Sequence, residues 1–130
     1  MIAPQARAEH VTAGIGCRRN CPATDIIAAL RKAEALAGVQ ATALATPHFK
    51  QQEPGLLEAA TLLDLPLHII DQAKMEAAQP HCPTRSQAAQ TATGLASIAE
   101  AAALACGPLI QPRVTHGAAT CALADTGAKT

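Results

Sequence analysis

Short apolar segments alternate with helix-forming segments along most of the chain, and this alternation constrains the fold more than any other feature. Val11 to Cys17, Val39 to Thr46 and Pro66 to Asp71 are typical of buried strands. Each is followed by a segment whose apolar residues recur at helical spacing. Parallel strands need such helical crossovers, so the pattern predicts a mostly parallel sheet covered by helices on both faces.

Residues with known end preferences mark the boundaries of the expected helices. Pro22 suits the first position of one helix and Gly38 its end, while Pro54 and Asp64 bound the next. Further helical segments are expected around residues 74–78, 86–92 and 97–107, the last opened by a capping box of Ser97 and Glu100.

The last third of the chain has the pattern of a β-hairpin. Leu109 to Val114 and Ala118 to Ala124 are apolar runs separated by Thr115, His116 and Gly117. The sequence therefore predicts an α/β fold: a three-layer α/β/α sandwich with a mixed, mostly parallel sheet of about five strands and a C-terminal hairpin.

A length of 130 residues is that of one compact domain, which excludes a multi-domain enzyme with separate cofactor and substrate modules. We expect a flexible leader over residues 1–9, a single domain over residues 10–125 and a tail over residues 126–130. Alanine is the most frequent residue, at 32 of 130, which predicts closely packed helices.

Charge and composition argue against several classes of partner. The formal net charge is zero and no basic block is present, so nucleic acid is not expected. Phe49 is the single aromatic side chain, which argues against a ligand held by stacking. No apolar run approaches the ~20 residues of a membrane span, so we expect a cytoplasmic protein with no membrane partner.

Cysteine and histidine spacing predicts neither a metal site nor a bound cofactor. Five cysteines occur without a CxxC pair, and no histidine pair has the spacing of a zinc site. We expect the cysteines to be mostly free thiols. Cys17 stands out because it precedes a helix start and two arginines, conditions that lower a thiol pKa and would make it a candidate nucleophile.

The loop after the first strand has the composition of an anion-binding site. Gly14, Gly16, Arg18 and Arg19 lie within nine residues of a helix start, where backbone amides carry partial positive charge. The same residues also fit a tight turn with solvated arginines. Asn20 tolerates left-handed backbone and supports a sharp turn in either case.

The loop after the second strand adds further polar side chains at the same predicted edge of the sheet. His48, Lys50 and Glu53 precede the helix that begins at Pro54. His48 and Glu53 could serve in acid–base chemistry, although a lone loop histidine is more often solvated and Glu53 also fits a helix N-terminal acid. Lys50 becomes important if it faces the same cleft as the two arginines.

Four segments in order resemble a known family. They are VTAGIGCRRNCPATDI, LATPHFKQQEPGLLEAA, TRSQAAQTATGLASIAEAAALA and GPLIQPRVTHGAATCALA. The chain resembles the CobE family over about residues 10 to 125, and that family is similar to the C-terminal domain of CbiG proteins of cobalamin biosynthesis. Asn20 stands where the family commonly has Gly, and Arg113 where it commonly has Lys.

The resemblance implies a cytoplasmic role in building the corrin ring. Corrin precursors bear many carboxylates, so we expect the cleft to bind such a tetrapyrrole intermediate as a carrier or chaperone. The alternative is a small hydrolase, because full-length CbiG proteins open a ring lactone of a cobalt-precorrin. Other pathway enzymes are further expected partners, and no catalytic residue is assigned. The expected binding residues are Gly14, Gly16, Cys17, Arg18, Arg19, Asn20, Lys50, Glu53, Arg113 and Thr115.

Overall fold

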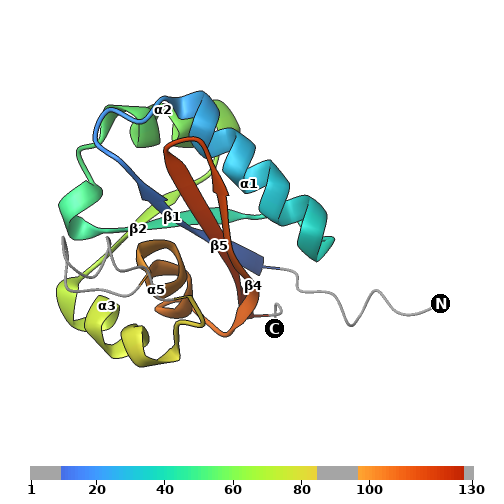
Figure 1. Cartoon of the computed structure of the whole chain (residues 1–130), viewed down its shortest axis with the longest axis vertical. Coiled ribbons are helices and arrows are strands. Elements are labelled where there is room, and N and C mark those ends of the chain that lie inside the picture. Colours follow the sequence, from blue (N-terminus) through green and yellow to red (C-terminus); the bar gives the residue numbers. More distant parts are fainter. Residues whose placement is uncertain (1–9, 85–96, 128–130) are drawn as a thin grey trace.

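A five-stranded mixed sheet runs through the centre of the molecule (Figure 1). The structure is a computed structural model that describes residues 10–84 and 97–127. The strands are β1 (His10–Cys17), β2 (Ala43–Pro47), β3 (Leu67–Ile70), β4 (Leu109–His116) and β5 (Ala119–Gly127), in the order β3-β2-β1-β5-β4. The first three are parallel, and β5 pairs antiparallel with both β1 and β4.

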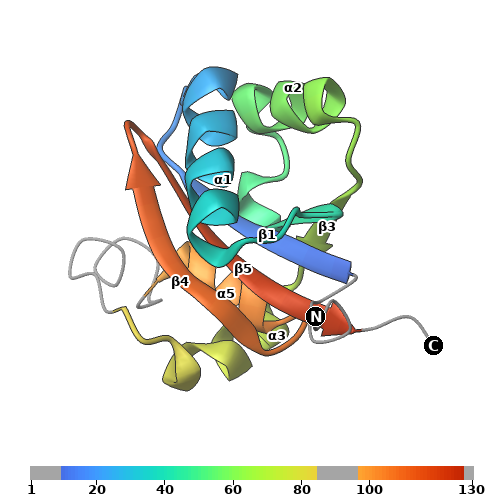
Figure 2. The same cartoon turned by 90° about the vertical axis from the view of Figure 1, so that its right-hand side faces the viewer.

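Helices cover both faces of the sheet, as the alternation of segments predicts. They are α1 (Ala23–Ala37), α2 (Pro54–Leu63), α3 (Gln72–Ala78) and α5 (Ile98–Leu104), with short 3-10 turns η2 (His48–Lys50) and η3 (Gln79–His81). Figures 1 and 2 show α1 and α2 on one face and α3 and α5 on the other. The predicted three-layer sandwich is confirmed. No helix in residues 10–84 and 97–127 is long and apolar enough to cross a membrane.

Some predicted boundaries differ from those observed. Pro22 is the N-cap of α1, with extended backbone, and not its first helical residue. The second strand begins at Ala43 and not at Val39, because buried Glu34 holds the preceding loop: its backbone oxygen accepts from Val39 N and its Oε2 accepts from Ala41 N at 2.8 Å. The predicted leader and the helix expected at 86–92 lie outside the described residues.

The C-terminal hairpin is longer than predicted and its turn is shorter. Thr115 and His116 belong to β4, where they pair with Thr120 and Ala119, so the turn consists of Gly117 and Ala118. The inner strand β5 runs along the whole of β1 and continues to Gly127, within the segment expected as a tail.

Small residues let α5 lie directly on the sheet. A methyl group at Gly14 would collide with the carbonyl oxygen of Ala99 and would lie 2.6 Å from the amide nitrogen of Ala103. The helix meets this position with buried alanines. The abundance of alanine therefore has a packing role, because larger side chains on α5 would push the helix away from β1.

A buried carboxylate joins α5 to two other segments. Ser97 caps the helix as predicted, with its hydroxyl accepting from Glu100 N at 3.5 Å. The Glu100 carboxylate, which is 0% exposed, accepts from the backbone N–H of Thr84 (2.8 Å), the Thr84 hydroxyl (2.8 Å) and the backbone N–H of Arg113 (2.9 Å). These bonds satisfy the carboxylate and connect α5 with the edge strand β4.

Candidate functional site at the carboxyl edge of the sheet

Loops and helix starts gather at the end of the sheet where β1, β2, β3 and β4 terminate, which we call the carboxyl edge. The connections after β1 and β2 lie on the same side of the sheet (Figure 1). The helices α1, α2 and α3 begin there, and Ile98 at the start of α5 lies beside Gly16. Helix N-termini present partial positive charge, so this edge favours an anionic ligand.

The β1–α1 turn (residues 18–21) is held in place by its neighbours. Its backbone closes through Cys21 N donating to Arg18 O at 3.1 Å, and Asn20 has the left-handed φ of 63° that the sharp turn requires. Arg18 N donates to Ala118 O at 3.0 Å, which joins the turn to the hairpin. The predicted tolerance of Asn20 for left-handed backbone is confirmed.

Glu53 connects this turn to the loop after β2. Its Oε2 accepts from Asn20 N at 2.6 Å, although Glu53 is itself the N-cap residue of α2. Gly55 brings α2 so close to the turn that a Cβ there would collide with the carbonyl oxygen of Cys21. In this arrangement the Glu53 carboxylate shapes the turn and lies directly beside it.

The arginines of the turn are exposed and have no acidic partner in the described structure. Within residues 10–84 and 97–127 the one ion pair joins Arg31 and Glu34. The nearby acid Asp25 accepts from the backbone N–H of Ala118 at 3.0 Å. Arg18 and Arg19 therefore present exposed guanidinium groups that form no ion pair, which suits them for carboxylate or phosphate binding.

The predicted low pKa of Cys17 is wrong. Burial raises the pKa of its thiol to about 11, and the ammonium of Lys50 offsets only part of that effect. The arginines and the helix start are visible in the sequence, but the loss of solvent around the sulfur arises only from the fold. The structure does bring Lys50 near Cys17. None of the five cysteines, all in the described part, forms a disulfide.

Cys17 is expected to react slowly with iodoacetamide in the folded protein, about tenfold slower at pH 7 than in the unfolded chain, because little thiolate is present. The rate should keep rising up to a pH of about 11, since the raised pKa delays ionisation. Peptide mass spectrometry of a pH series, with the same chain in denaturant as control, measures this. A rate that levels off below pH 8 would contradict the raised pKa.

Four expected binding residues lie away from the turn. Gly14 and Gly16 are buried residues within β1 and do not belong to the loop that follows this strand. The backbone of α5 lies against Gly14, and Ile98 and Thr120 lie against Gly16. Arg113 and Thr115 belong to β4 and not to a loop. Thr115 still lies near the carboxyl edge, where its carbonyl oxygen accepts from Lys32 Nζ at 3.1 Å.

Phe49 also belongs to this edge, although it was not among the expected binding residues. It lies in η2, directly after β2, and 42% of its surface is exposed. The ring of His48 meets it edge-on, with 5.5 Å between the centroids. The position of Phe49 one residue before Lys50 was the available sign that it belongs to the site. Because Phe49 is the single aromatic side chain, however, the composition argued against a ligand held by stacking.

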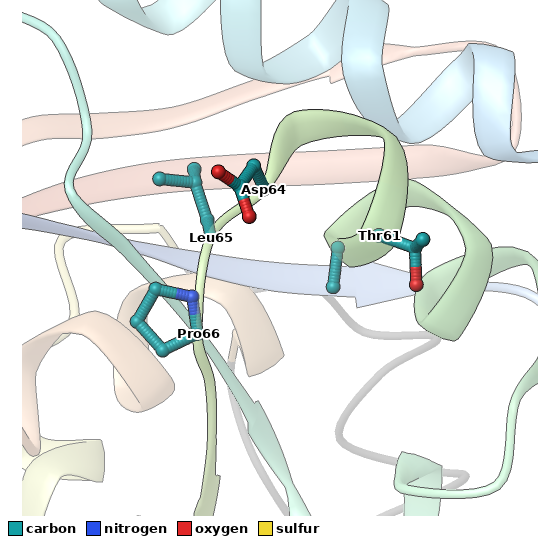
Figure 3. Close-up of a pocket in the computed structure, with 5 residues that line it drawn as sticks. Thr61, Asp64, Leu65 and Pro66 are labelled. Atoms are coloured by element: carbon teal, nitrogen blue, oxygen red, sulfur yellow. The ribbon is translucent and has the colours of Figure 1, made fainter.

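Two pockets lined by described residues lie elsewhere. One, of about 460 Å³, is at the opposite end of the sheet, where α2 ends and β3 begins. Figure 3 shows Thr61 and Asp64 at the end of α2 and Leu65 and Pro66 on the connection to β3. The other, of about 290 Å³, lies between α3 and the end of α5 and includes Lys74 and His81. Among the described residues, no group of three or more His, Cys, Asp or Glu could hold a metal ion.

Taken together, the fold and this edge define a small α/β/α sandwich protein with an exposed cationic turn at the carboxyl ends of its strands. Comparison with known proteins narrows the class. The family described as "Cobalamin synthesis G C-terminus" matches residues 11–124. The chain belongs to this family, and it is a protein of the cobalamin biosynthesis pathway.

Named relatives agree with this assignment. Protein CobE of Sinorhizobium sp is 34% identical over 118 residues, covering 85% of this chain and 77% of the relative. The crystal structure of a CobE from the cobalamin (vitamin B12) biosynthetic pathway is similar, with a TM-score of 0.83 and 35% identity over 93% of each chain. Cobalamin biosynthesis protein chiG from Agrobacterium tumefaciens gives a TM-score of 0.71 at 43% identity, over 90% of this chain and 98% of that one.

Proposed function

We propose that the protein binds a carboxylate-rich tetrapyrrole intermediate, a precorrin or corrinoid, at the carboxyl edge and acts as its carrier or chaperone. The proposal rests on the β1–α1 turn. Its backbone is held by neighbouring segments, and its two arginines are exposed and have no acidic partner among the described residues. An anionic ring rim can take bidentate hydrogen bonds from such groups. Lys50 supplies a third cation in the adjacent loop.

Rigid support makes the turn suitable for binding. Its backbone is held by Ala118 on one side and by Glu53 on the other. A ligand therefore meets side chains whose backbone is already ordered, which lowers the entropy cost of association. Arg113 and Thr115 on β4 would extend the same surface for a large ring, since Thr115 lies one residue before β4 ends at the carboxyl edge.

We also propose partners and a location for the protein. The partners are the ligand itself and the pathway enzymes that make and consume it, and the location is the cytoplasm, in keeping with five cysteines that are all thiols. The alternative is hydrolysis of a ring lactone. It is less well supported, since burial keeps the Cys17 thiol protonated at neutral pH.

Cobyrinic acid, a corrin that keeps its rim carboxylates, is expected to bind with a saturable shift of its visible spectrum. A shift that then stays constant supports a carrier. The hydrolase alternative needs a lactone-bearing cobalt-precorrin as substrate, and with that substrate a spectrum that keeps changing after binding would support hydrolysis. Absence of any shift overturns tetrapyrrole binding. Cobinamide, whose rim carries amides, is the matched probe, and it should bind more weakly if the carboxylates are recognised.

The double variant Arg18→Ala/Arg19→Ala is expected to weaken cobyrinic acid binding about tenfold at low ionic strength, because charge-assisted hydrogen bonds are lost. The difference should shrink as salt is added, since exposed charges are screened. The control Arg31→Ala removes an exposed guanidinium that is paired with Glu34 on α1. Equal affinities of the double variant and the wild type would place the ligand elsewhere.

A further inference from the structure

Phe49 has an unusual place for the single aromatic side chain of the sequence. Full burial of a phenylalanine side chain usually stabilises a fold, because a large apolar surface is removed from water. This chain instead builds its core from aliphatic residues and leaves Phe49 42% exposed. Other large apolar side chains are also exposed, but Phe49 lies in η2, at the carboxyl edge.

The ring of Phe49 is supported by its neighbour. His48 packs against it in an edge-to-face geometry, with an interplanar angle of 83° and 5.5 Å between the centroids. Both residues belong to the single turn of η2, which follows β2 directly. This contact restricts the Phe49 ring, which presents an apolar surface at the carboxyl edge, one residue before Lys50 in η2.

We infer that Phe49 is a specificity-determining residue that contacts the apolar face of the macrocycle, while the cations bind its rim; this rests on the proposed function. A tetrapyrrole ligand has two chemical parts, an apolar ring system and charged side chains. Arginine and lysine side chains recognise the charges but do not distinguish a ring from any other polycarboxylate. The aromatic surface supplies that distinction, because an open-chain acid has no ring face to place on it.

The contact is tested by titrating cobyrinic acid into wild type, Phe49→Ala and Phe49→Leu at low and high ionic strength. Phe49→Ala is expected to weaken binding about tenfold at both salt concentrations, because an apolar contact is not screened. Phe49→Leu should retain part of the affinity. Leu62→Ala is the matched control, since Leu62 is 64% exposed on α2.

Each outcome has a separate meaning. Affinity of Phe49→Ala within twofold of the wild type, with the wild type binding saturably, overturns the role of Phe49 and leaves the proposed function intact. A loss that disappears at high salt also overturns it, because the effect would then be electrostatic. Failure of the wild type to bind overturns the proposed function and this inference together.

Discussion

Replacement of Gly14 by alanine is expected to lower the free energy of unfolding by about 3 kcal/mol, a large part of the stability of a domain of this size. The added methyl group would meet the backbone of α5 at Ala99 and Ala103, which cannot rotate away as a side-chain end can. Either α5 must move off β1 or the strand must bend. Urea unfolding followed by circular dichroism measures the loss.

Gly38→Ala is the matched control for this substitution. Gly38 has a φ of 74° at the end of α1, and nothing lies within 4 Å of the position that a Cβ would occupy. Alanine there meets only the conformational penalty of left-handed backbone, about 1 kcal/mol. If Gly14→Ala costs no more than Gly38→Ala, the close seating of α5 on β1 is incorrect.

Glu100→Ala is expected to lower the free energy of unfolding by roughly 2–4 kcal/mol, because buried donors lose their acceptor. The donors are the backbone N–H and hydroxyl of Thr84 and the backbone N–H of Arg113. The free energy of unfolding of Glu100→Gln should lie between those of the wild type and Glu100→Ala. The glutamine amide keeps one acceptor oxygen but turns an N–H₂ group toward a donor. Chemical denaturation of the three proteins gives the order.

Glu58→Ala provides the comparison for the loss of a glutamate at an exposed helical position on α2. Surface substitutions of this kind usually change stability by about 0.5 kcal/mol or less. Equal effects of Glu100→Ala and Glu58→Ala would mean that the three hydrogen bonds are replaced by water without cost.

Periodicity and end signals predicted the layers of this fold because they are local properties of the chain. As predicted, Pro54 begins α2, Gly38 and Asp64 end helices, and Ser97 caps α5. The left-handed backbone at the two helix ends is seen only in the structure. Strand limits were less accurate. The start of β2 depends on the buried carboxylate of Glu34, a contact that no local pattern encodes.

The candidate site could be predicted only in part. Spacing placed Arg18, Arg19, Lys50 and Glu53 at one edge, and the structure agrees. A glycine pair before a helix, however, fits either an anion-binding loop or close packing of backbone. Ala99 decides between these two roles for Gly14, because its backbone lies against Gly14 in the fold although it is far away in the sequence. Burial of the Cys17 sulfur was likewise a tertiary effect.

The two borders of the sheet differ in their capacity to recruit another strand. On β4, Pro112 has no N–H to donate, the pairing register shifts around it, and the N–H of Arg113 is already bonded to Glu100. Among the described residues, β3 ends the sheet on the other side. Growth of a fibril by successive strand addition needs two receptive borders, so self-association through the sheet would stop at a pair of molecules.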